Sequence, residues 1–206
     1  MKAIIIGAGR GKRLMPTTAD TPKCLAEVGG RRILDRILEA FTSNGVTDVC
    51  FIGGYQIDKV RAVYPHLRFI HNAEWENNNI LVSLMCAEAE MVSPFISCYS
   101  DTLFAPAVVE KLLASAADIS LVIDTEWRPR YAYRTQHPSH DAEKITALNG
   151  AITRIHRDIA EAAAYGEFTG MAKFSRAGAA LLREHYHGCQ SLYRSEERRV
   201  GKECRL

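Results

Sequence analysis

The chain has 206 residues, which suffice for one sizeable α/β core but are short for two, so we expect a single domain. Hydrophobic residues make up 47% of the sequence and charged residues 24%, with a formal net charge of +2. No apolar run approaches the roughly 20 residues that a membrane helix needs, so the sequence predicts no membrane-spanning segment.

Strand-like and helix-like segments alternate along the first 124 residues. Residues 2–7 (KAIIIG) are apolar and β-branched, which predicts a strand. Residues 32–44 carry apolar side chains at helical spacing, and Gly45 is expected to end that helix. The same reasoning predicts strands at 48–52, 67–70, 95–100 and 119–124, and helices at 57–64, 80–91 and 108–116.

The last third of the chain is less regular. Residues 125–143 are polar and contain proline, which indicates a long loop. The segment ITALNGAITRI is typical of a hairpin that turns at Asn149-Gly150, and a strand at 168–175 and a helix at 177–187 follow. The whole pattern predicts an α/β fold with a mixed, mainly parallel sheet sandwiched by helices.

Residues 194–206 (RSEERRVGKECRL) are abruptly charged and fit no periodic pattern. They resemble the translation of a sequencing-library adapter, so we expect a domain at 1–193 that is truncated at its C-terminus, followed by an artefactual tail. Five of the 26 basic and three of the 24 acidic residues lie in this tail, so the domain itself is formally neutral. A neutral domain without a basic stripe predicts no nucleic-acid binding.

The six cysteines are scattered, and none belongs to a C-x-x-C pair. This usage is typical of inert thiols in a reducing compartment, so we expect a cytoplasmic protein.

The first predicted strand runs into the loop GAGRGKRLMPTTADTPKCL (Gly7 to Leu25). Small residues let backbone N–H groups approach an anion, and neighbouring cations neutralise it, so the loop predicts a polyphosphate site. A P-loop is excluded because Ile6 stands where its first glycine belongs and Arg13 follows Gly11-Lys12. A dinucleotide loop is excluded because Lys12 replaces the third glycine.

The remaining pattern, G-x-G-x-R-L-x-P followed by P-K, resembles the signature of nucleotidyltransferases that join an NTP to a phosphorylated small molecule. The matching residues are Gly7, Gly9, Gly11, Arg13, Leu14, Pro16, Pro22 and Lys23. The stretch WENNNILVSL (Trp75 to Leu84) narrows the resemblance to the branch of phosphocholine and 2-aminoethylphosphonate cytidylyltransferases. The resemblance implies the Rossmann-like fold of nucleotide-diphospho-sugar transferases.

The predicted reaction is attack of a phosphate or phosphonate oxygen on the α-phosphorus of an NTP. Arg13 and Lys23 are the candidate catalytic cations, because two anions must be brought together. Asp101, just beyond a predicted strand, is the candidate ligand of the Mg²⁺ cofactor. The candidate nucleotide-binding residues are Gly7, Ala8, Gly9, Arg10, Gly11, Gly54, Tyr55, Asn78 and Ser83.

The acceptor side is predicted from the long loop and from the motif GEFTGMAKFS. An aromatic ring beside a carboxylate can hold an ammonium group, which makes Asp124 and Trp127 candidates. The resemblance adds Glu167 and Gly170, which line the acceptor side in related enzymes. Structural explanations without a ligand also remain open. GEFTGMAKFS can be an ordinary strand, the aromatic residues can pack the long loop against the protein, and Asp101 can be a helix or turn cap.

The lead interpretation is transfer of CMP from CTP to a small phosphorylated amine or alcohol such as phosphocholine, with release of pyrophosphate. A sugar-1-phosphate nucleotidyltransferase that uses another NTP is the alternative enzyme. A nucleotide-binding regulatory module without catalysis is the alternative from another class. The sequence leaves the base, the acceptor and the oligomeric state open.

Overall fold

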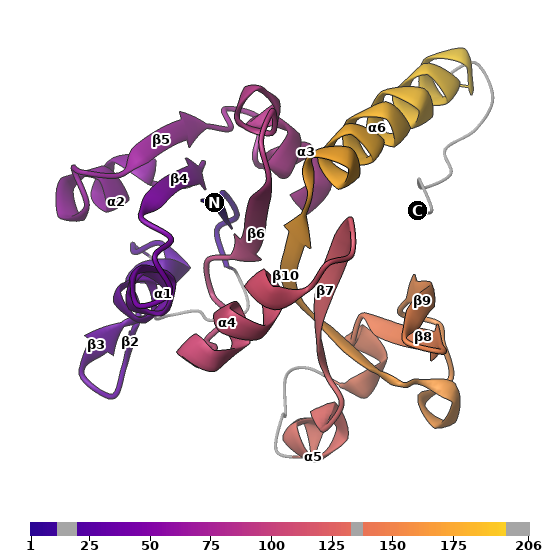
Figure 1. Cartoon of the computed structure of the whole chain (residues 1–206). Helices are drawn as coiled ribbons and strands as arrows, with labels where there is room; N and C mark the ends of the chain where they lie inside the picture. Colours follow the sequence, from indigo (N-terminus) through magenta and orange to yellow (C-terminus); the bar gives the residue numbers. More distant parts are fainter. Residues whose placement is uncertain (12–19, 133–137, 197–206) are drawn as a thin grey trace.

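The structure is a computed structural model that describes residues 1–11, 20–132 and 138–196, with side chains up to Cys189 (Figure 1). In chain order its strands and α-helices are β1 (Lys2–Gly7), β2 (Glu27–Val28), β3 (Arg31–Arg32), α1 (Ile33–Thr42), β4 (Asp48–Gly53), α2 (Ile57–Val63), β5 (Arg68–His71), α3 (Ile80–Met85), β6 (Phe95–Tyr99), α4 (Pro106–Ala114), β7 (Ile119–Asp124), α5 (Trp127–Tyr131), β8 (Lys144–Leu148), β9 (Ala151–His156), β10 (Gly166–Phe174) and α6 (Arg176–Glu196).

Eight of the ten described strands form a mixed sheet in the order β5-β4-β1-β6-β10-β8-β9, with β7 also paired to β10, and β2 pairs with β3 separately. The four strands from β5 to β6 are parallel. β10 is antiparallel to β6, β7 and β8. The first strand of the chain therefore lies inside the parallel part of the sheet, between β4 and β6, and the predicted sheet is confirmed.

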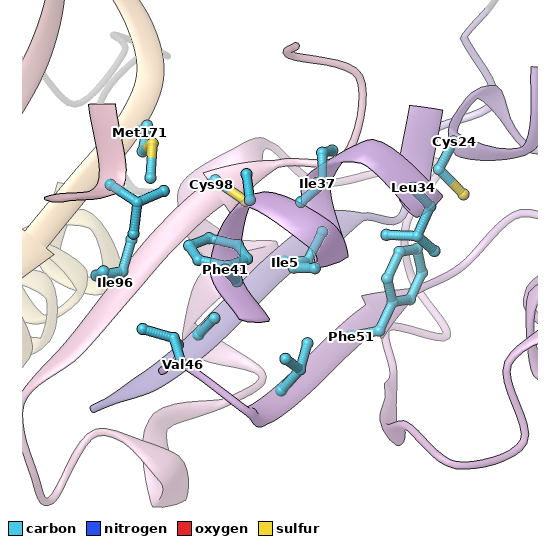
Figure 2. Close-up of a cluster of buried hydrophobic side chains, with 14 of the residues drawn as sticks. Ile5, Cys24, Leu34, Ile37, Phe41, Val46, Phe51, Ile96, Cys98 and Met171 are labelled. Carbon is cyan, nitrogen blue, oxygen red and sulfur yellow. The ribbon is translucent and has the colours of Figure 1, made fainter. Parts of the chain in front are cut away.

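Helices cover both faces of this sheet (Figure 1), because the central strands carry apolar side chains on both faces. Ile5 of β1 packs with Phe51 and with the apolar side of α1 in the cluster of Figure 2. Ile4 and Ile6 face the other way and pack with residues of α3 and α6. Each fully buried side chain of this size contributes about 1.5–3 kcal/mol, so the two clusters hold the parallel strands in place.

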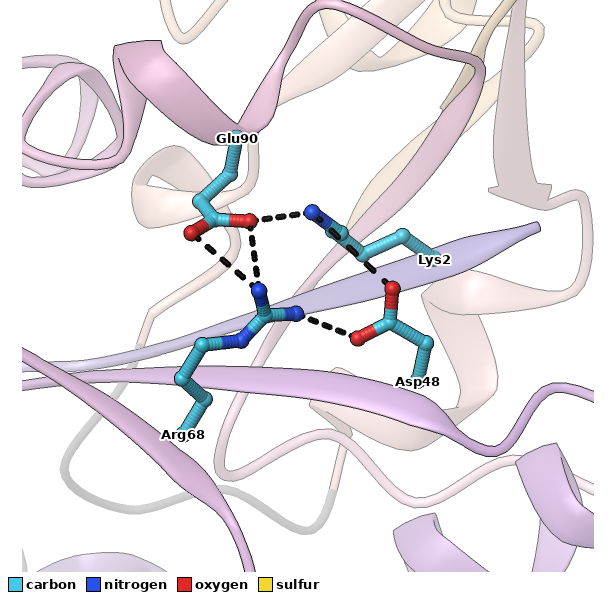
Figure 3. Close-up of polar contacts among 4 residues, drawn as sticks. All are labelled: Lys2, Asp48, Arg68 and Glu90. Carbon is cyan, nitrogen blue, oxygen red and sulfur yellow. Dashed lines mark hydrogen bonds and ion pairs between the residues drawn. The ribbon is translucent and has the colours of Figure 1, made fainter.

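A network of ion pairs lies at the end of the sheet opposite the loop after β1 (Figure 3). Lys2 of β1 pairs with Glu90 and lies 3.9 Å from Asp48 of β4. Arg68 of β5 pairs with the same two carboxylates, with Nη1 3.1 Å from Oε2 of Glu90. This four-residue network therefore joins the N-terminal ends of three neighbouring strands.

The structure adds the short strands β2 and β3, which the sequence did not predict, and it differs from the prediction at residues 80–91 and 125–143. The helix expected at 80–91 ends at Met85 and is followed by a separate 3-10 turn at Glu88–Glu90, which places Glu90 beside Lys2 and Arg68. The loop expected at 125–143 contains α5 and a 3-10 turn at Ser139–Asp141. Aromatic burial explains α5, because its first residue, Trp127, is only 1% exposed.

The predicted hairpin at 145–155 is confirmed as β8 and β9. Its turn residues Asn149 and Gly150 have φ of 51° and 78°, the left-handed conformations that a tight two-residue turn requires. A cleft of about 890 Å³ lies between this hairpin and β7, and none of the predicted site residues lines it.

The last helix, α6, runs beyond the predicted limit at 187 and crosses the boundary expected at residue 193. Residues 197–206 of the expected tail lie outside the described residues. Within the described part of the chain, no helix has both the length and the apolar character needed to cross a membrane.

Candidate nucleotide site

The loop after β1 shares one edge of the sheet with the ends of β4 and β6. Gly7 is in register with Gly53, and the Ser100 amide donates to the carbonyl of Ile6 at 3.0 Å. The Tyr55 amide donates to the carbonyl of Ala8 at 2.9 Å. The structure thus brings the glycine loop, Gly54-Tyr55 and the turn that carries Asp101 together at this edge.

The glycines of this edge differ in whether the surrounding atoms leave room for a side chain. A Cβ at Gly7 would lie 2.5 Å from Phe51 Cζ, and a Cβ at Gly54 would lie 2.6 Å from Trp75 Cβ. A Cβ at Gly9 would meet no atom within 4 Å, so packing does not require glycine there. Gly9 therefore leaves open space above the sheet, into which a ligand can approach the backbone.

Lys23 is held at this edge by the residue that follows it. It begins a 3-10 turn at Lys23–Leu25, and Cys24 of the same turn is 1% exposed and packs in the cluster of Figure 2. The Lys23 ammonium group forms an ion pair with Oδ2 of Asp101. Both side chains are about one-third exposed (28% and 30%), so the pair remains within reach of a ligand.

Buried thiols flank this ion pair. Burial, together with the charge of Asp101, raises the pKa of the Cys24 thiol to about 12 and raises the pKa of the Cys98 thiol as well. Both thiols are therefore neutral and are not nucleophiles at physiological pH.

Asp101 is the one predicted metal ligand. Within the described residues, no group of three or more histidine, cysteine or acidic side chains is arranged to hold a metal ion. A single exposed carboxylate still suits Mg²⁺, which takes one or two carboxylates and completes its shell with phosphate oxygens and water. Arg13, the second predicted catalytic cation, lies outside the described residues.

On the β4 side of the loop, three side chains surround the phenol of Tyr55. The guanidinium carbon of Arg10 lies 5.4 Å from the ring centroid, and the Trp75 ring meets the Tyr55 ring edge-on at 5.5 Å. The Gln56 amide donates to the Tyr55 hydroxyl at 3.0 Å. The sequence interpretation included Arg10 and Tyr55 but not Gln56, which follows the Gly54-Tyr55 pair without any motif of its own.

The asparagines before α3 form a closed network around Asn72, which is 2% exposed. Asn72 and Asn78 exchange a reciprocal pair of amide hydrogen bonds at 2.9 and 3.0 Å. Asn72 also donates to Ser83 Oγ at 2.9 Å. Asn79 is the helix cap, because its Oδ1 accepts from Val82 N at 3.0 Å.

The Asn72 network lies at the end of β4, since the Asn72 amide donates to the carbonyl of Gly53. The side chains of Asn78 and Ser83, which were predicted to bind the nucleotide, thus form hydrogen bonds that stabilise this edge of the sheet. Their nucleotide role stays a prediction.

The predicted acceptor residues gather where β7 and β10 pair. Glu167 is in register with Asp124, and its carboxylate accepts a hydrogen bond from the Tyr131 hydroxyl of α5. The Arg130 guanidinium pairs with Asp124 at 2.8 Å. The structure thus brings two carboxylates together across adjacent strands.

Trp127 and Gly170 have structural functions in the same region. Trp127 is buried, with the Arg128 guanidinium 5.6 Å from its ring. Gly170 has φ of 83°, and a Cβ there would lie 2.1 Å from Tyr99. Packing and backbone geometry therefore account for both residues without a ligand, and their acceptor role stays a prediction.

Comparison with known proteins gives one consistent result. The family model of the MobA-like NTP transferase domain matches residues 3–194. A CTP:phosphoglutamine cytidylyltransferase of Campylobacter jejuni is 31% identical over 188 residues, which cover 85% of this chain and 73% of the relative. A choline-phosphate cytidylyltransferase of Streptococcus pneumoniae is 32% identical over 50% of this chain and 46% of the relative.

A solved structure of an inositol-1-phosphate CTP transferase from T. maritima superimposes with a TM-score of 0.70 at 22% identity, covering 87% of this chain and 72% of that one. This likeness confirms the predicted fold. The family match runs from the first strand into the last helix and includes the whole edge described above, and the chain belongs to the nucleotidyltransferases of the MobA-like NTP transferase domain family.

Proposed function

We propose that this chain is a Mg²⁺-dependent cytidylyltransferase that transfers CMP from CTP to a small phosphorylated or phosphonate amine or alcohol. The observation that carries the proposal is the Lys23–Asp101 ion pair beside the open glycine loop. This pair supports the proposal because a lysine on a flexible stem and a carboxylate would meet a triphosphate that approaches the backbone there. The cytidylyltransferases among the relatives support CTP as the donor.

The reaction needs little covalent help from the protein. A phosphate monoester is largely dianionic at neutral pH, because its second pKa lies near 6, so no general base is required. The obstacle is repulsion between the acceptor and the triphosphate. Lys23 can bridge the α-phosphate and the incoming oxygen, since its flexible stem lets the ammonium group leave Asp101.

The remaining contribution of the protein is to position the triphosphate and neutralise its charge. We assign the backbone of residues 7–11 to the triphosphate and Arg13 to the β- and γ-phosphates, which a guanidinium can hold bidentately. Asp101 would hold Mg²⁺, and the ion would neutralise phosphate oxygens during the departure of pyrophosphate.

The acceptor would lie toward β10. Thr102 Oγ1 donates to the carbonyl of Thr169 at 3.0 Å, which joins the turn after Asp101 to the strand that carries Glu167. Arg130 balances the charge of Asp124, but Glu167 is held by the neutral Tyr131 hydroxyl and adds negative charge beyond this point, which favours an acceptor with a cationic end. An amine-bearing acceptor is therefore our first choice.

A sugar 1-phosphate is the second candidate acceptor. A probable glucose-1-phosphate cytidylyltransferase of Bacillus subtilis is 28% identical over 53% of this chain and 44% of that relative, which favours this alternative. Sugar hydroxyls can donate to an amide oxygen as well as to a carboxylate, whereas a cationic group needs the charge, so Glu167→Gln should impair an amine-bearing acceptor more than a sugar.

The test is release of pyrophosphate with each of the four NTPs against phosphocholine, 2-aminoethylphosphonate, phosphorylated glutamine and glucose 1-phosphate. We expect turnover with CTP and an amine-bearing acceptor, and loss of turnover in Arg13→Ala and Lys23→Ala. Nucleotide binding without pyrophosphate release for any acceptor would instead indicate a regulatory module. Equal turnover with a neutral sugar phosphate would reassign the acceptor.

A further inference from the structure

Two buried polar atoms near the Tyr55 ring lack hydrogen-bond partners among the residues that the structure describes. They are Nε of Arg10, a donor, and Oε1 of Gln56, an acceptor. Both side chains contact the same aromatic residue, since the Arg10 guanidinium lies over the ring and the Gln56 amide donates to the hydroxyl. A buried donor and a buried acceptor without partners are costly, and a bound molecule that pairs with both would recover that cost.

The backbone of Gln56 is strained as well. Its φ of 47° is left-handed, a conformation that glycine and asparagine adopt far more readily. The other described non-glycine residue with positive φ is Asn149, whose hairpin turn requires it. Gln56 precedes α2 without a side-chain capping bond, so the helix does not explain a glutamine here. Strain that local structure does not require points to a function.

The position of Gln56 relative to the phosphate site suggests which part of a nucleotide it would meet. Lys23 and Asp101 gather the charges on the β6 side of the loop, whereas Gln56 and Tyr55 follow β4 on the other side. A nucleotide whose phosphates lay toward Lys23 and Asp101 would direct its nucleoside to the other side of the loop, toward Tyr55. The side-chain amide of Asn78, another predicted nucleotide-binding residue, is engaged with Asn72.

We propose that Gln56 and Arg10 read the nucleobase and select cytosine over uracil. The Gln56 amide is oriented by the bond from its Nε2 to the Tyr55 hydroxyl, which leaves Oε1 to accept. Cytosine offers an exocyclic N4 amino donor and, beside it, ring and carbonyl acceptors that suit the Arg10 donor. Uracil carries an acceptor, O4, where cytosine has the amino group, and two facing acceptors leave both unpaired. This inference rests on the proposed function and extends it to base selection.

Base entry requires one movement. Because Nε of Arg10 and Oε1 of Gln56 are both covered, side chains around Tyr55 must move before a base can reach them. The Tyr55–Trp75 contact lies beside this movement, so Trp75 fluorescence should change when a cytosine nucleotide binds.

The experiment measures binding of CTP, UTP and inorganic tripolyphosphate by calorimetry, with Trp fluorescence in parallel and no acceptor present. In the parent chain we expect CTP to bind roughly tenfold or more tightly than UTP, as expected when a site is built to hydrogen-bond the correct group. Gln56→Met and Arg10→Lys should bring the CTP:UTP ratio close to one. Tripolyphosphate affinity should not change in Gln56→Met. The matched control is Asp58→Asn on the exposed side of α2, which should keep the parent ratio.

Gln56→Gly separates base reading from a structural role. Glycine relieves the left-handed strain, so this variant should unfold at a higher temperature than the parent while losing base preference. An undiminished CTP:UTP ratio in Gln56→Met or Gln56→Gly overturns the inference, as does equal affinity of the parent for CTP and UTP. In both cases pyrophosphate release would still support the proposed transferase. If the parent binds no nucleotide, the proposed function fails together with the inference.

Discussion

The ammonium group of Lys23 meets the carboxylate of Asp101 across 78 positions of sequence, and neither charge is deeply buried. The pair is therefore available to a ligand and is a weak source of stability, because exposed ion pairs contribute about 0–1 kcal/mol. Lys23→Met should lower pyrophosphate release roughly a hundredfold or more while the thermal unfolding midpoint stays near that of the parent. Lys111→Met, an exposed lysine of α4, is the matched control. Near-normal turnover in Lys23→Met would contradict the assignment.

Asp101→Asn tests the metal ligand. The amide keeps the shape of the carboxylate but lacks the charge that holds Mg²⁺, so half-maximal activity should require a much higher Mg²⁺ concentration. Activity is titrated with MgCl₂ at fixed CTP in parent and variant. The exposed Asp58→Asn variant controls for the loss of one negative charge. Superimposable titrations would show that the ion is held elsewhere.

Gly9→Ala should weaken nucleotide binding without affecting stability, whereas Gly54→Ala should lower stability. A Cβ at Gly9 meets open space, whereas one at Gly54 meets Trp75 at 2.6 Å. We expect Gly9→Ala to fold like the parent but to bind CTP more weakly, because the methyl group occupies the approach to the backbone. Gly54→Ala should lose roughly 1–3 kcal/mol of stability through overpacking. Urea unfolding and CTP titration of both variants measure this contrast, and unchanged CTP affinity in Gly9→Ala would contradict a close ligand at that glycine.

Glu90→Gln should affect stability without affecting the site. Glu90 receives both Lys2 and Arg68 at the end of the sheet opposite the glycine loop (Figure 3). The variant should be destabilised by about 1 kcal/mol, with a smaller difference at high salt because ions screen the network. Urea midpoints at low and high NaCl, alongside the CTP-dependent activity, check this. A large fall in activity at unchanged stability would place Glu90 in the catalytic machinery instead.

Alkaline pH should weaken the fold through its buried thiols. Burial, followed by the charge of Glu90, raises the pKa of Cys50 to about 11, and burial raises that of Cys24 to about 12. Unfolded cysteines ionise near pH 8.5, so above that pH the unfolded chain binds fewer protons than the folded chain. The contribution of these thiols to the free energy of unfolding is therefore fully present below about pH 8.5 and is lost as the pH rises toward 11–12.

Cys50→Ala isolates one contribution to this decline. Between pH 8 and pH 10 the variant should lose about 1 kcal/mol less than the parent, because the thiolate no longer favours the unfolded state. Urea unfolding of both proteins at the two pH values gives the difference. Parallel declines in parent and variant would show that the Cys50 thiol does not contribute.

The periodicity of the sequence sufficed to predict the alternating framework of strands and helices. The central strands are buried on both faces, and each is followed by small or polar residues, so Gly7 and Asp101 could be placed at strand ends from pattern alone. The resemblance to the nucleotidyltransferase signature named Lys23 as a candidate, and its role stays a prediction.

Other features depend on contacts that no local pattern encodes. The mutual pairing of Asn72 with Asn78 joins residues that look like separate polar positions in sequence. Trp127 appeared to belong to an open loop but is buried at the start of α5. Gln56 became visible only through its backbone φ and its unpaired oxygen, neither of which has a signature in sequence.

The direction of β1 has a practical consequence. The strand starts at the charged network of Lys2 and ends at Gly7 beside the candidate site, and Met1 is 48% exposed. A label, a purification tag or a sensor surface attached through the first residue would therefore sit at the far end of the sheet. Immobilisation by the N-terminus should leave the nucleotide edge facing the solution, which suits the chain to surface-based measurement of small-ligand binding.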